Sequence, residues 1–506
     1  MAELTFLGID LGAESGRVIA GSFDGHRINL KEVTRFPTEN TYLCSHLYWD
    51  VLAIFSRIKE GLTLACREFK NISGIGVTTW GVDYGLLGPG DFLLGNPFHY
   101  RDRRTEGMME KAFEKVPRPE IFRETGNQFM PLNTLFQILA THQDYPEILN
   151  LARCLLFMPN LFSFWLCGEK VAEYTIASTS QMYNSQAAGQ PGAPRGNWCF
   201  SLLERLGLPT HFLPPVVSSG TCLGNLLPEI QKELGLPVIP VYAVCAHDTA
   251  SAVAAVPASG EESSWAYLSS GTWSLLGIEV PDPIINEKTY QYNCTNEGGF
   301  GGSIRLLKNI MGLWILQECR RNWERQNKLY SYEELINKAQ EAKPFVSFIN
   351  VDDPRFLYPG DMISRIREYC QNTGQPIPNT EGEVVRIILE SLAMEYRYVL
   401  LQLEDIIERK IEVLHIVGGG SQNKLLSQFA SSASKKTVIA GPIEATAAGN
   451  VLVQALARRE IADLSQLREI TRDSFPLIVF QPKDTGLWEE KYQIYCQLKR
   501  AGQQSG

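Results

Sequence analysis

Several common signatures are absent from this 506-residue sequence. It contains no Gly-Lys pair, and so no P-loop, and neither a G-x-S-x-G elbow nor a G-x-G-x-x-G turn between a strand and a helix. Its eleven cysteines form no C-x-x-C pair, and none of its seven histidines lies three or four residues from another. This spacing argues against a zinc site of the ordinary kind. Any nucleotide chemistry must therefore use another architecture.

Basic charge and long apolar runs are also scarce. Lys and Arg number 47 against 56 Asp and Glu, and the net charge of −9 argues against nucleic-acid binding. The first apolar stretch has no basic region before it and is interrupted by Asp10, so no signal peptide is predicted. The most apolar segment, residues 151–168, contains Arg153 and Pro159, whereas a membrane span needs about 20 mostly apolar residues. We predict a cytoplasmic protein with reduced cysteines and no membrane or nucleic-acid partner.

Strands alternate with amphipathic helices along the chain, which is typical of α/β architecture. Residues 4–9 and 17–23 are expected to form a hairpin. A helix is expected after the N-cap residue Asp50, and residues 72–80 form the next expected strand.

The length of the chain argues for more than one domain. We place the boundary after a strand expected at residues 238–245. This divides the chain into an N-terminal domain, residues 1–245, and a C-terminal domain, residues 246–506.

A turn of small and polar residues, Asp10-Leu-Gly-Ala-Glu-Ser-Gly-Arg17, is a candidate phosphate site. Its glycines let backbone N–H groups approach an anion, and Ser15 and Arg17 add a hydroxyl and a guanidinium. Asp10, at the end of an apolar strand, could hold Mg²⁺ through water. An ordinary hairpin in which Asp10 caps the turn would explain the same residues.

Two further turns lie in the second half of the chain. Ser269-Ser-Gly-Thr272 follows a strand expected at residues 265–268 and repeats the chemistry of the first turn. The Gly418-Gly-Gly420 triplet follows another short strand, and its glycines permit close approach of a base or ribose. A strand turn that needs glycine for its conformation is the other interpretation of the triplet. Two phosphate turns, one in each half, suit the phosphate chain of ATP.

The sharpest candidate for catalysis is the segment Ala246-His247-Asp248-Thr249. An ionised Asp248 after an apolar strand can accept a proton from a substrate hydroxyl, as phosphoryl transfer requires. An N-cap aspartate beside a core histidine is the structural alternative.

These segments resemble those of the FGGY carbohydrate kinases, in the same order, from about residue 5 to about residue 480. The ordered set is far more specific than any one motif. The segments that carry the resemblance are Asp10–Arg17, Thr79–Asp83, Tyr100–Asp102, His247–Ser251, Tyr267–Ser274, Thr295–Gly299, Leu307–Trp314, His415–Gly420 and Ala440–Ala445.

The resemblance implies two ribonuclease-H-like domains of the actin-like ATPase type, with ATP and Mg²⁺ in an inter-domain cleft. It implies that Asp248 is the general base that activates the 1-hydroxyl of the ketose L-rhamnulose, in L-rhamnose catabolism. The implied sugar-site residues are Gly81, His247, Thr249 and Asn309. The implied nucleotide-site residues are Ala13, Glu14, Ser15, Gly16, Arg17, Thr272, Gln317 and Gly419, with Asp10 placing the metal ion. The protein is expected to act as a monomer.

Two local expectations accompany this resemblance. Glu14 stands where the family more often has a small hydroxyl residue, so its side chain is expected to point away from the phosphates. Trp80, Asp83 and Tyr84 offer polar groups and an apolar wall for the methyl of a deoxysugar, although both aromatics could equally belong to the core.

Two other functions remain open. One is another FGGY ketose kinase, acting on L-fuculose or a xylulose, because one methyl group changes binding by only about 1–3 kcal/mol. The other is an actin- or Hsp70-like ATPase, which would share the phosphate turns. That ATPase would need neither His247-Asp248-Thr249 nor the polar cluster at Thr295-Asn-Glu297.

Overall fold

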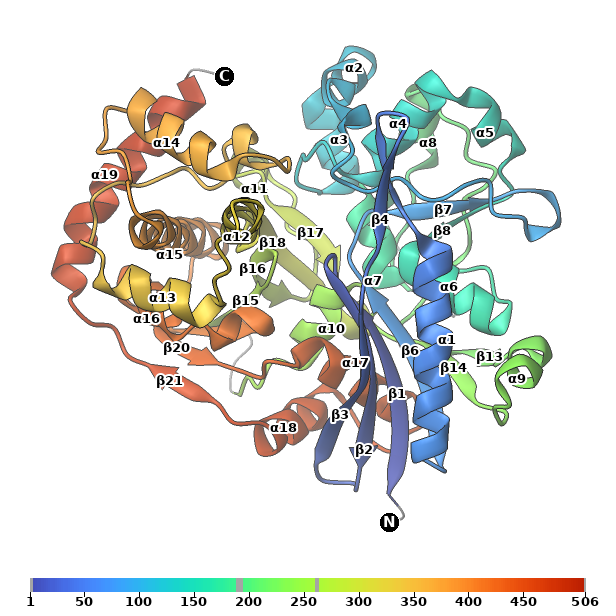
Figure 1. Cartoon of the computed structure of the whole chain (residues 1–506). Helices are drawn as coiled ribbons and strands as arrows, with labels where there is room; N and C mark the ends of the chain where they lie inside the picture. Colours follow the sequence, from blue (N-terminus) through green and yellow to red (C-terminus); the bar gives the residue numbers. More distant parts are fainter. Residues whose placement is uncertain (1–2, 188–193, 260–263, 505–506) are drawn as a thin grey trace. The chain divides into compact units, whose positions relative to one another are not determined.

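The computed structural model describes residues 3–187, 194–259 and 264–504. Contacts divide the chain into two compact units, each built from segments that are distant in sequence. Unit 1 comprises Met1–Pro257, Glu279–Leu306 and Glu444–Phe475, and unit 2 comprises Ala258–Ile278, Leu307–Ile443 and Pro476–Gly506. Sheets and helices occur in both units, which confirms the predicted α/β class (Figure 1). Among the described residues, no helix is long and apolar enough to cross a membrane.

The central sheet of unit 1 begins with the predicted hairpin. β1 pairs antiparallel with β2 and parallel with β6, so the hairpin feeds directly into a mixed sheet. In sheet order the strands are β13 (Thr221–Asn225), β14 (Pro240–Ala243), β6 (Ile72–Thr79), β1 (Leu4–Leu11), β2 (Ser15–Phe23) and β3 (Ile28–Pro37).

Two helices cover opposite faces of this sheet. α1 (Val51–Glu68) begins after Asp50, whose side chain accepts from the backbone N–H of Ala53, as predicted for an N-cap. Gly61 of α1 packs against Val18, whereas α17 (Ala445–Ala457) packs on the other face of β2. There a Cβ on Gly21 would lie only 2.6 Å from Val451, so glycine is needed for this close approach.

The remaining elements of unit 1 surround this sheet or build a second apolar core beside β7 and β8. Between β3 and β13 they are β4 (Asn40–Leu43), β5 (His46–Trp49), β7 (Tyr84–Leu87), α2 (Met108–Lys115), α3 (Arg118–Thr125), α4 (Thr134–Asp144), α5 (Pro146–Leu151), β8 (Cys154–Phe157), α6 (Met158–Cys167), β9 (Ala172–Glu173), α7 (Tyr174–Ala177), β10 (Tyr183–Asn184), β11 (Asn197–Trp198), α8 (Phe200–Arg205) and β12 (Val216–Val217). Later in the chain follow α9 (Pro228–Leu234), α10 (Asp248–Ala254), α11 (Glu287–Gln291), β17 (Thr295–Gly298) and α18 (Leu464–Ser474).

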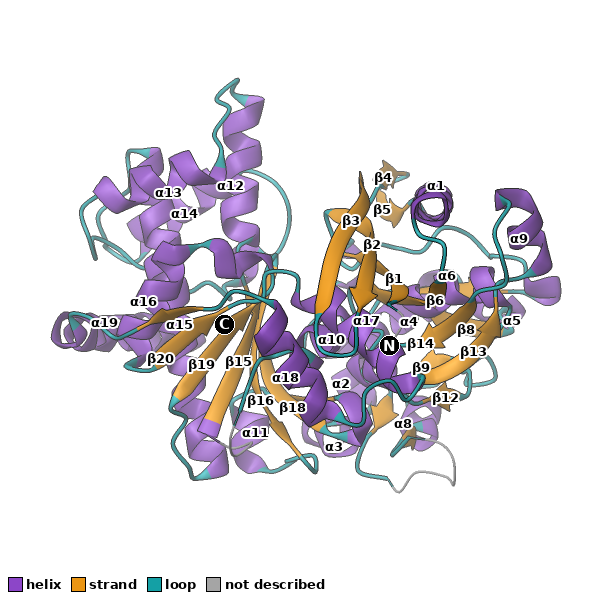
Figure 2. Ribbon diagram, turned by 90° about the horizontal axis from the view of Figure 1, so that it is seen from below, coloured by secondary structure: helices purple, strands orange, loops and turns teal. Residues whose placement is uncertain are grey.

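Unit 2 is built on a sheet that starts from the second predicted hairpin (Figure 2). In sheet order, the strands that belong mostly to unit 2 are β18 (Ile304–Met311), β16 (Trp273–Val280), β15 (Trp265–Ser270), β19 (Val413–Val417), β20 (Thr437–Ala440) and β21 (Ile478–Phe480). The helices of this unit are α12 (Trp314–Arg325), α13 (Tyr332–Glu341), α14 (Met362–Asn372), α15 (Glu381–Ile407), α16 (Lys424–Ser434) and α19 (Thr485–Gln504).

The division into units differs from the predicted boundary between residues 245 and 246. α10, which carries Asp248, belongs to unit 1 because it packs closely on α17. The hydroxyl of Ser251 donates to the carbonyl of Thr446 at 2.9 Å, and a Cβ on Gly449 would overlap the Ser251 carbonyl. A composition change along the chain cannot reveal that residues 444–475 return to complete the first unit.

Candidate active site

The first hairpin brings Asp10 and Arg17 face to face. The two residues are register partners at the end of β1 and the start of β2, and the guanidinium donates to Oδ2 of Asp10 at 2.5 Å. Arg17 also pairs with Glu444, at the start of α17. Burial lowers the pKa of Arg17, but the two carboxylates outweigh it and raise the pKa above its usual value. The cation is therefore held between two carboxylates. No local sequence signal could have indicated the second one, Glu444.

The turn between the two strands is rigidly built. The backbone N–H of Gly12 donates to the carbonyl of Ser15 at 3.0 Å, and the hydroxyl of Thr38 donates to the carbonyl of Gly12 at 2.9 Å. A Cβ on Gly16 would lie 2.5 Å from the ring of Phe36, so only glycine fits there. The Glu14 side chain is exposed.

The segment His247-Asp248-Thr249 lies at the start of α10. Oδ1 of Asp248 accepts from the backbone N–H of Thr249 and lies 3.2 Å from the Thr249 hydroxyl and 3.4 Å from Nε2 of His247. Within the described parts of the chain, the hydrogen bonds and close charge contacts of the Asp248 carboxylate all involve Oδ1. The side chain keeps 31% of its surface exposed. One oxygen is thus anchored while the other is available to a substrate.

The surroundings of Asp248 adjust its acidity. Burial and the nearby charge of Asp10 raise the pKa of Asp248 to about 7, against the lowering effects of Thr249 and Arg305. A general base works best with a pKa near the working pH, so this carboxyl is suited to take up a proton at neutral pH. His247 occupies the N-cap position without a side-chain capping bond, and Asp248 is the first residue of the helix, so Asp248 is not the N-cap of the structural alternative.

His247 is held from behind by a buried ion pair. Nδ1 of His247 lies 3.1 Å from Nη2 of Arg305, and this same nitrogen of Arg305 donates to Glu297 at 3.0 Å. Burial, and then the charge of Arg305, holds the pKa of His247 well below its ordinary value. The ring is therefore neutral at physiological pH. Glu297 lies in the polar cluster singled out in the sequence, whereas nothing in the sequence indicated Arg305.

Gly81 faces this histidine. A Cβ on Gly81 would lie 3.3 Å from both Nε2 of His247 and the hydroxyl oxygen of Thr179. The next residue, Val82, has a φ of +67°, and the backbone N–H of Asp83 donates across it to the carbonyl of Gly81 at 2.9 Å. This is a classic-type γ-turn, which is rare and strained for a β-branched residue. Strain of this kind persists only where the surroundings impose it, and here it brings the Gly81 backbone next to His247.

The buried side chain of Asp83 anchors the γ-turn at Val82 through hydrogen bonds to core residues. Its Oδ2 accepts from the indole N–H groups of Trp49 at 2.6 Å and Trp80 at 3.0 Å, and its Oδ1 accepts from the amide of Gln137 at 2.9 Å. Burial raises the pKa of Asp83 to about 6, against these hydrogen bonds, which lower it. Trp80 and Tyr84 are also buried. The two aromatics therefore take the core position that was the alternative in the sequence, and Asp83 is a structural anchor.

Unit 2 gathers three of the predicted nucleotide residues around its own hairpin turn. β15 runs parallel to β19 with Ser269 opposite Val417, so Thr272 and the glycine triplet extend beyond neighbouring strand ends. The backbone N–H of Trp314, at the start of α12, donates to the carbonyl of Thr272 at 3.1 Å, and Gln317 lies one turn further along this helix. No atom lies within 4 Å of a Cβ built on Gly419, so this part of the loop is open.

The predicted sugar residues are divided between the units. Gly81, His247 and Thr249 are in unit 1, whereas Asn309 lies on β18 in unit 2. Within the described parts of the chain, no group of three or more His, Cys, Asp or Glu side chains could hold a metal ion. Only Oδ2 of Asp10 is bonded to Arg17, so Oδ1 remains for a hydrated ion.

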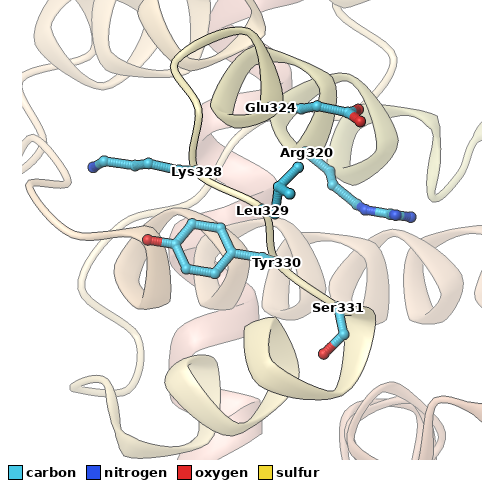
Figure 3. A pocket seen from close by; sticks show the side chains of 6 residues that line it. All are labelled: Arg320, Glu324, Lys328, Leu329, Tyr330 and Ser331. Atoms are coloured by element: carbon cyan, nitrogen blue, oxygen red, sulfur yellow. The ribbon is translucent and has the colours of Figure 1, made fainter.

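A separate cavity of about 310 Å³ opens at the end of α12. Lys328 and Tyr330 lie on one side of Leu329, and Arg320 and Glu324 lie on the other (Figure 3). Lys328 is paired with Glu381 at 2.9 Å. None of the predicted site residues lines this cavity, so it lies apart from the candidate active site.

The sequence matches the N-terminal domain of the FGGY family of carbohydrate kinases over residues 5–255 and the C-terminal domain over residues 266–458. It is 46% identical to a protein named rhamnulokinase from Bacteroides thetaiotaomicron, over 96% of this chain and 98% of that protein. It is 38% identical to a rhamnulokinase from Bacillus subtilis, over 95% of this chain and 96% of the other.

Solved structures have the same fold at low sequence identity. A gluconate kinase from Lactobacillus acidophilus superposes with a TM-score of 0.79 at 16% identity, over 99% of this chain and 98% of that one. A xylulose kinase from the same organism also gives a TM-score of 0.79 at 16% identity, over 98% of each chain. The two family matches together span most of the sequence, and this chain belongs to the FGGY family of carbohydrate kinases.

Proposed function

We propose that this chain transfers the terminal phosphate of ATP to the 1-hydroxyl of L-rhamnulose, giving L-rhamnulose 1-phosphate and ADP. The choice of sugar is supported by the rhamnulokinases to which the chain is similar over nearly its whole length. The reaction is supported by one observation above all. Asp248 has one anchored carboxylate oxygen, one oxygen without a described donor, and a pKa raised to about 7.

Asp248 acts as the general base in this proposal. Its Oδ2 takes the proton of the 1-hydroxyl while the sugar oxygen forms a bond to the terminal phosphorus and the bond between that phosphorus and the leaving oxygen of ADP breaks. Thr249 and His247 hold Oδ1, so the carboxylate does not rotate away from the sugar. General-base catalysis of this kind contributes a factor of about 10²–10⁴ to the rate.

The other predicted residues keep the roles that the resemblance implies. In the proposal, the sugar is bound by the Gly81 backbone, His247, Thr249 and Asn309. The phosphates of ATP are held by the turn at residues 13–17 and by Thr272, and Gln317 and Gly419 contact the rest of the nucleotide. Arg17, which is bonded to Asp10 and Glu444, then also faces the phosphates of ATP.

Asp10 would hold Mg²⁺. This ion keeps several waters and usually binds protein through one or two carboxylates together with substrate phosphates. Asp10 fits that chemistry, because Arg17 bonds only one of its two oxygens. When bound, Mg²⁺ would neutralise negative charge on the phosphates.

We place the protein in the cytoplasm, as a monomer. None of the eleven cysteines, all of which lie in the described parts of the chain, forms a disulfide, as expected in a reducing compartment. Light scattering of the purified protein at micromolar concentration measures its mass directly. A dimer mass would contradict the monomer and leave the proposed reaction unaffected.

The proposed reaction is tested by measuring ADP release with ATP and each of L-rhamnulose, L-fuculose, L-xylulose, D-xylulose and glycerol. The highest kcat/KM is expected with L-rhamnulose, and NMR of the product should locate the phosphate on C1. The Asp248→Asn variant, purified in the same way, reports any contaminating ATPase. A higher kcat/KM with another ketose would assign that sugar instead. ADP release that no sugar accelerates would favour the actin- or Hsp70-like alternative.

A further inference from the structure

Arg305 is a fully buried cation directly behind the candidate active site. Its relative exposure is 0%. It donates through Nη2 to Glu297 at 3.0 Å and through Nε to the carbonyl of Gly298 at 2.9 Å. A buried charge is costly unless it is paired and hydrogen-bonded, and replacing both partners by apolar residues often costs nothing. Stability alone therefore does not explain this ion pair. The third contact of Arg305, with His247, suggests a function.

The contact with His247 determines where the imidazole carries its proton. A guanidinium can donate hydrogen bonds but cannot accept them. Nη2 of Arg305 lies 3.1 Å from Nδ1 of His247, so Nδ1 must be the accepting, unprotonated nitrogen. The other group facing Nδ1 is Glu297, whose Oε2 lies 3.5 Å away and already accepts from Arg305.

The neutral ring must then carry its proton on Nε2. This nitrogen lies 3.4 Å from Oδ1 of Asp248. It also borders the backbone of Gly81, where a Cβ would lie 3.3 Å away. An N–H at this position can donate toward the carboxylate or toward a sugar oxygen, but it cannot accept a proton. The burial and the Arg305 charge that lower the pKa of His247 act in the same sense, because they oppose a second proton on the ring.

We propose that Arg305, held by Glu297, is a positioning residue that fixes His247 as the neutral Nε2–H tautomer. In this form the ring donates to Oδ1 of Asp248, and Oδ2 is left as the proton acceptor. Glu297, Arg305, His247 and Asp248 form one polar chain within unit 1. The inference deepens the proposed function and rests on it for the role of Asp248 as the base.

The tautomer can be measured without any enzyme assay. Full-length protein labelled with ¹⁵N-histidine is compared with the His247→Gln variant to assign the ring nitrogens of His247. We expect a protonated Nε2 and an unprotonated Nδ1 throughout the range from about pH 5 to pH 8, in which an ordinary histidine changes its charge. A protonated Nδ1, or a doubly protonated ring near neutral pH, would overturn the proposal.

The effect on catalysis is measured with Arg305→Met, which keeps an unbranched side chain and removes the donors. We expect kcat to fall about 10- to 100-fold, the loss typically seen when the hydrogen-bond partner that orients a metal-ligating histidine is removed. Arg305→Lys, which can also only donate, should recover part of that loss. The matched control is Arg468→Met, which breaks another buried ion pair of unit 1, with Glu279, and should leave kcat unchanged.

An equal loss of kcat in Arg305→Met and Arg468→Met would show that Arg305 is merely structural and would overturn the proposal. An unchanged kcat in Arg305→Met would overturn it as well. If Arg305→Met does not fold, Glu297→Gln replaces it, since it keeps the volume and removes the charge that holds Arg305. We expect the same loss of kcat in Glu297→Gln, together with a ring whose tautomer is no longer fixed. Failure of the proposed function is recognised separately. In that case the wild-type protein does not phosphorylate L-rhamnulose, while its His247 still has the Nε2–H tautomer.

Discussion

Glu173 and Ala246 are joined by a hydrogen bond in which the backbone N–H of Ala246 donates to Oε2 of Glu173 at 3.1 Å. The hydroxyl oxygen of Thr175, itself bonded to Glu173, accepts from the backbone N–H of His247 at 3.2 Å. The carboxylate is completely buried and accepts further hydrogen bonds from Thr175, Ile176 and Ser219. One side chain therefore fixes the backbone that carries His247 into place.

Glu173→Gln should destabilise unit 1. The amide group of glutamine is itself a donor and would face backbone and hydroxyl donors that now have an acceptor. Each buried donor left unpaired costs about 1–3 kcal/mol, so we expect a loss of that order in the free energy of unfolding, measured with urea. Glu60→Gln, at a side chain that is 60% exposed, is the control and should change stability by less than about 0.5 kcal/mol. Equal stability of the two variants would contradict this prediction.

Asp248→Asn should abolish most of the turnover while keeping the fold. The amide has the same shape but cannot take up the proton, so we expect kcat to fall by a factor of about 10²–10⁴. The apparent affinities for sugar and ATP should change little, because the loss is felt mainly in the transition state. Steady-state kinetics with both substrates separates these effects. Near wild-type turnover would rule out Asp248 as the base.

The acid side of the pH–rate profile should report the same carboxyl. Burial and Asp10 raise the pKa of Asp248 to about 7, and the base works only when it is deprotonated. We therefore expect kcat/KM to fall as the pH decreases below about 7. Removing the charge of Asp10 in Asp10→Asn should lower the pKa of Asp248 and shift this limb to lower pH, whatever its effect on the height of the profile. A limb near the usual range of aspartate in the wild-type protein would argue against the raised pKa.

Gly81→Ala should weaken sugar binding more than ATP binding. The added methyl would lie 3.3 Å from His247 and Thr179, in the space beside the proposed sugar site. One extra methyl group in a binding pocket changes binding by about 1–3 kcal/mol, which corresponds to a rise in the sugar KM of roughly 5- to 150-fold. Gly486→Ala, where no atom lies within 4 Å of the new Cβ, is the matched control. An unchanged sugar KM in Gly81→Ala would place the sugar elsewhere.

Gly419→Ala should weaken ATP binding more than sugar binding. No protein atom lies within 4 Å of the new methyl, so stability should be retained, while the space proposed for the nucleotide is partly filled. We expect a higher KM for ATP, an unchanged KM for the sugar and an unaltered midpoint of thermal unfolding. Unchanged kinetics with ATP would show that the nucleotide does not approach this glycine.

The local elements were largely predictable because each depends on neighbouring residues. The hairpin at β1 and β2, the N-cap at Asp50 and the paired turns of the second half follow from alternation of apolar residues, capping chemistry and glycine. The predicted strand at residues 238–245 is shorter in the structure, where β14 spans Pro240–Ala243 and the backbone N–H of Ala246, just beyond it, donates to Glu173.

The long-range parts of the site could not be predicted in this way. Glu444 meets Arg17 across 427 residues, and Arg305 meets His247 across 58. Neither contact has a spacing that a periodic pattern could reveal. The sequence left both positions of Trp80 open, since a tryptophan at the end of a strand can face either a pocket or the interior, and the structure buries it.

The interleaved order of segments in the two units has a consequence for synthesis on the ribosome. β1 and β2 leave the ribosome first, yet the helix that covers one of their faces, α17, ends only at Ala457. The amide of Gln454 then donates to the carbonyl of Leu7 at 3.0 Å, across 447 residues. At about 5–20 residues per second, the apolar face of the first hairpin waits on the order of tens of seconds for its partner. The nascent chain is thus an expected client of a holding chaperone, and a fragment that ends at residue 245 would expose the face that α17 covers.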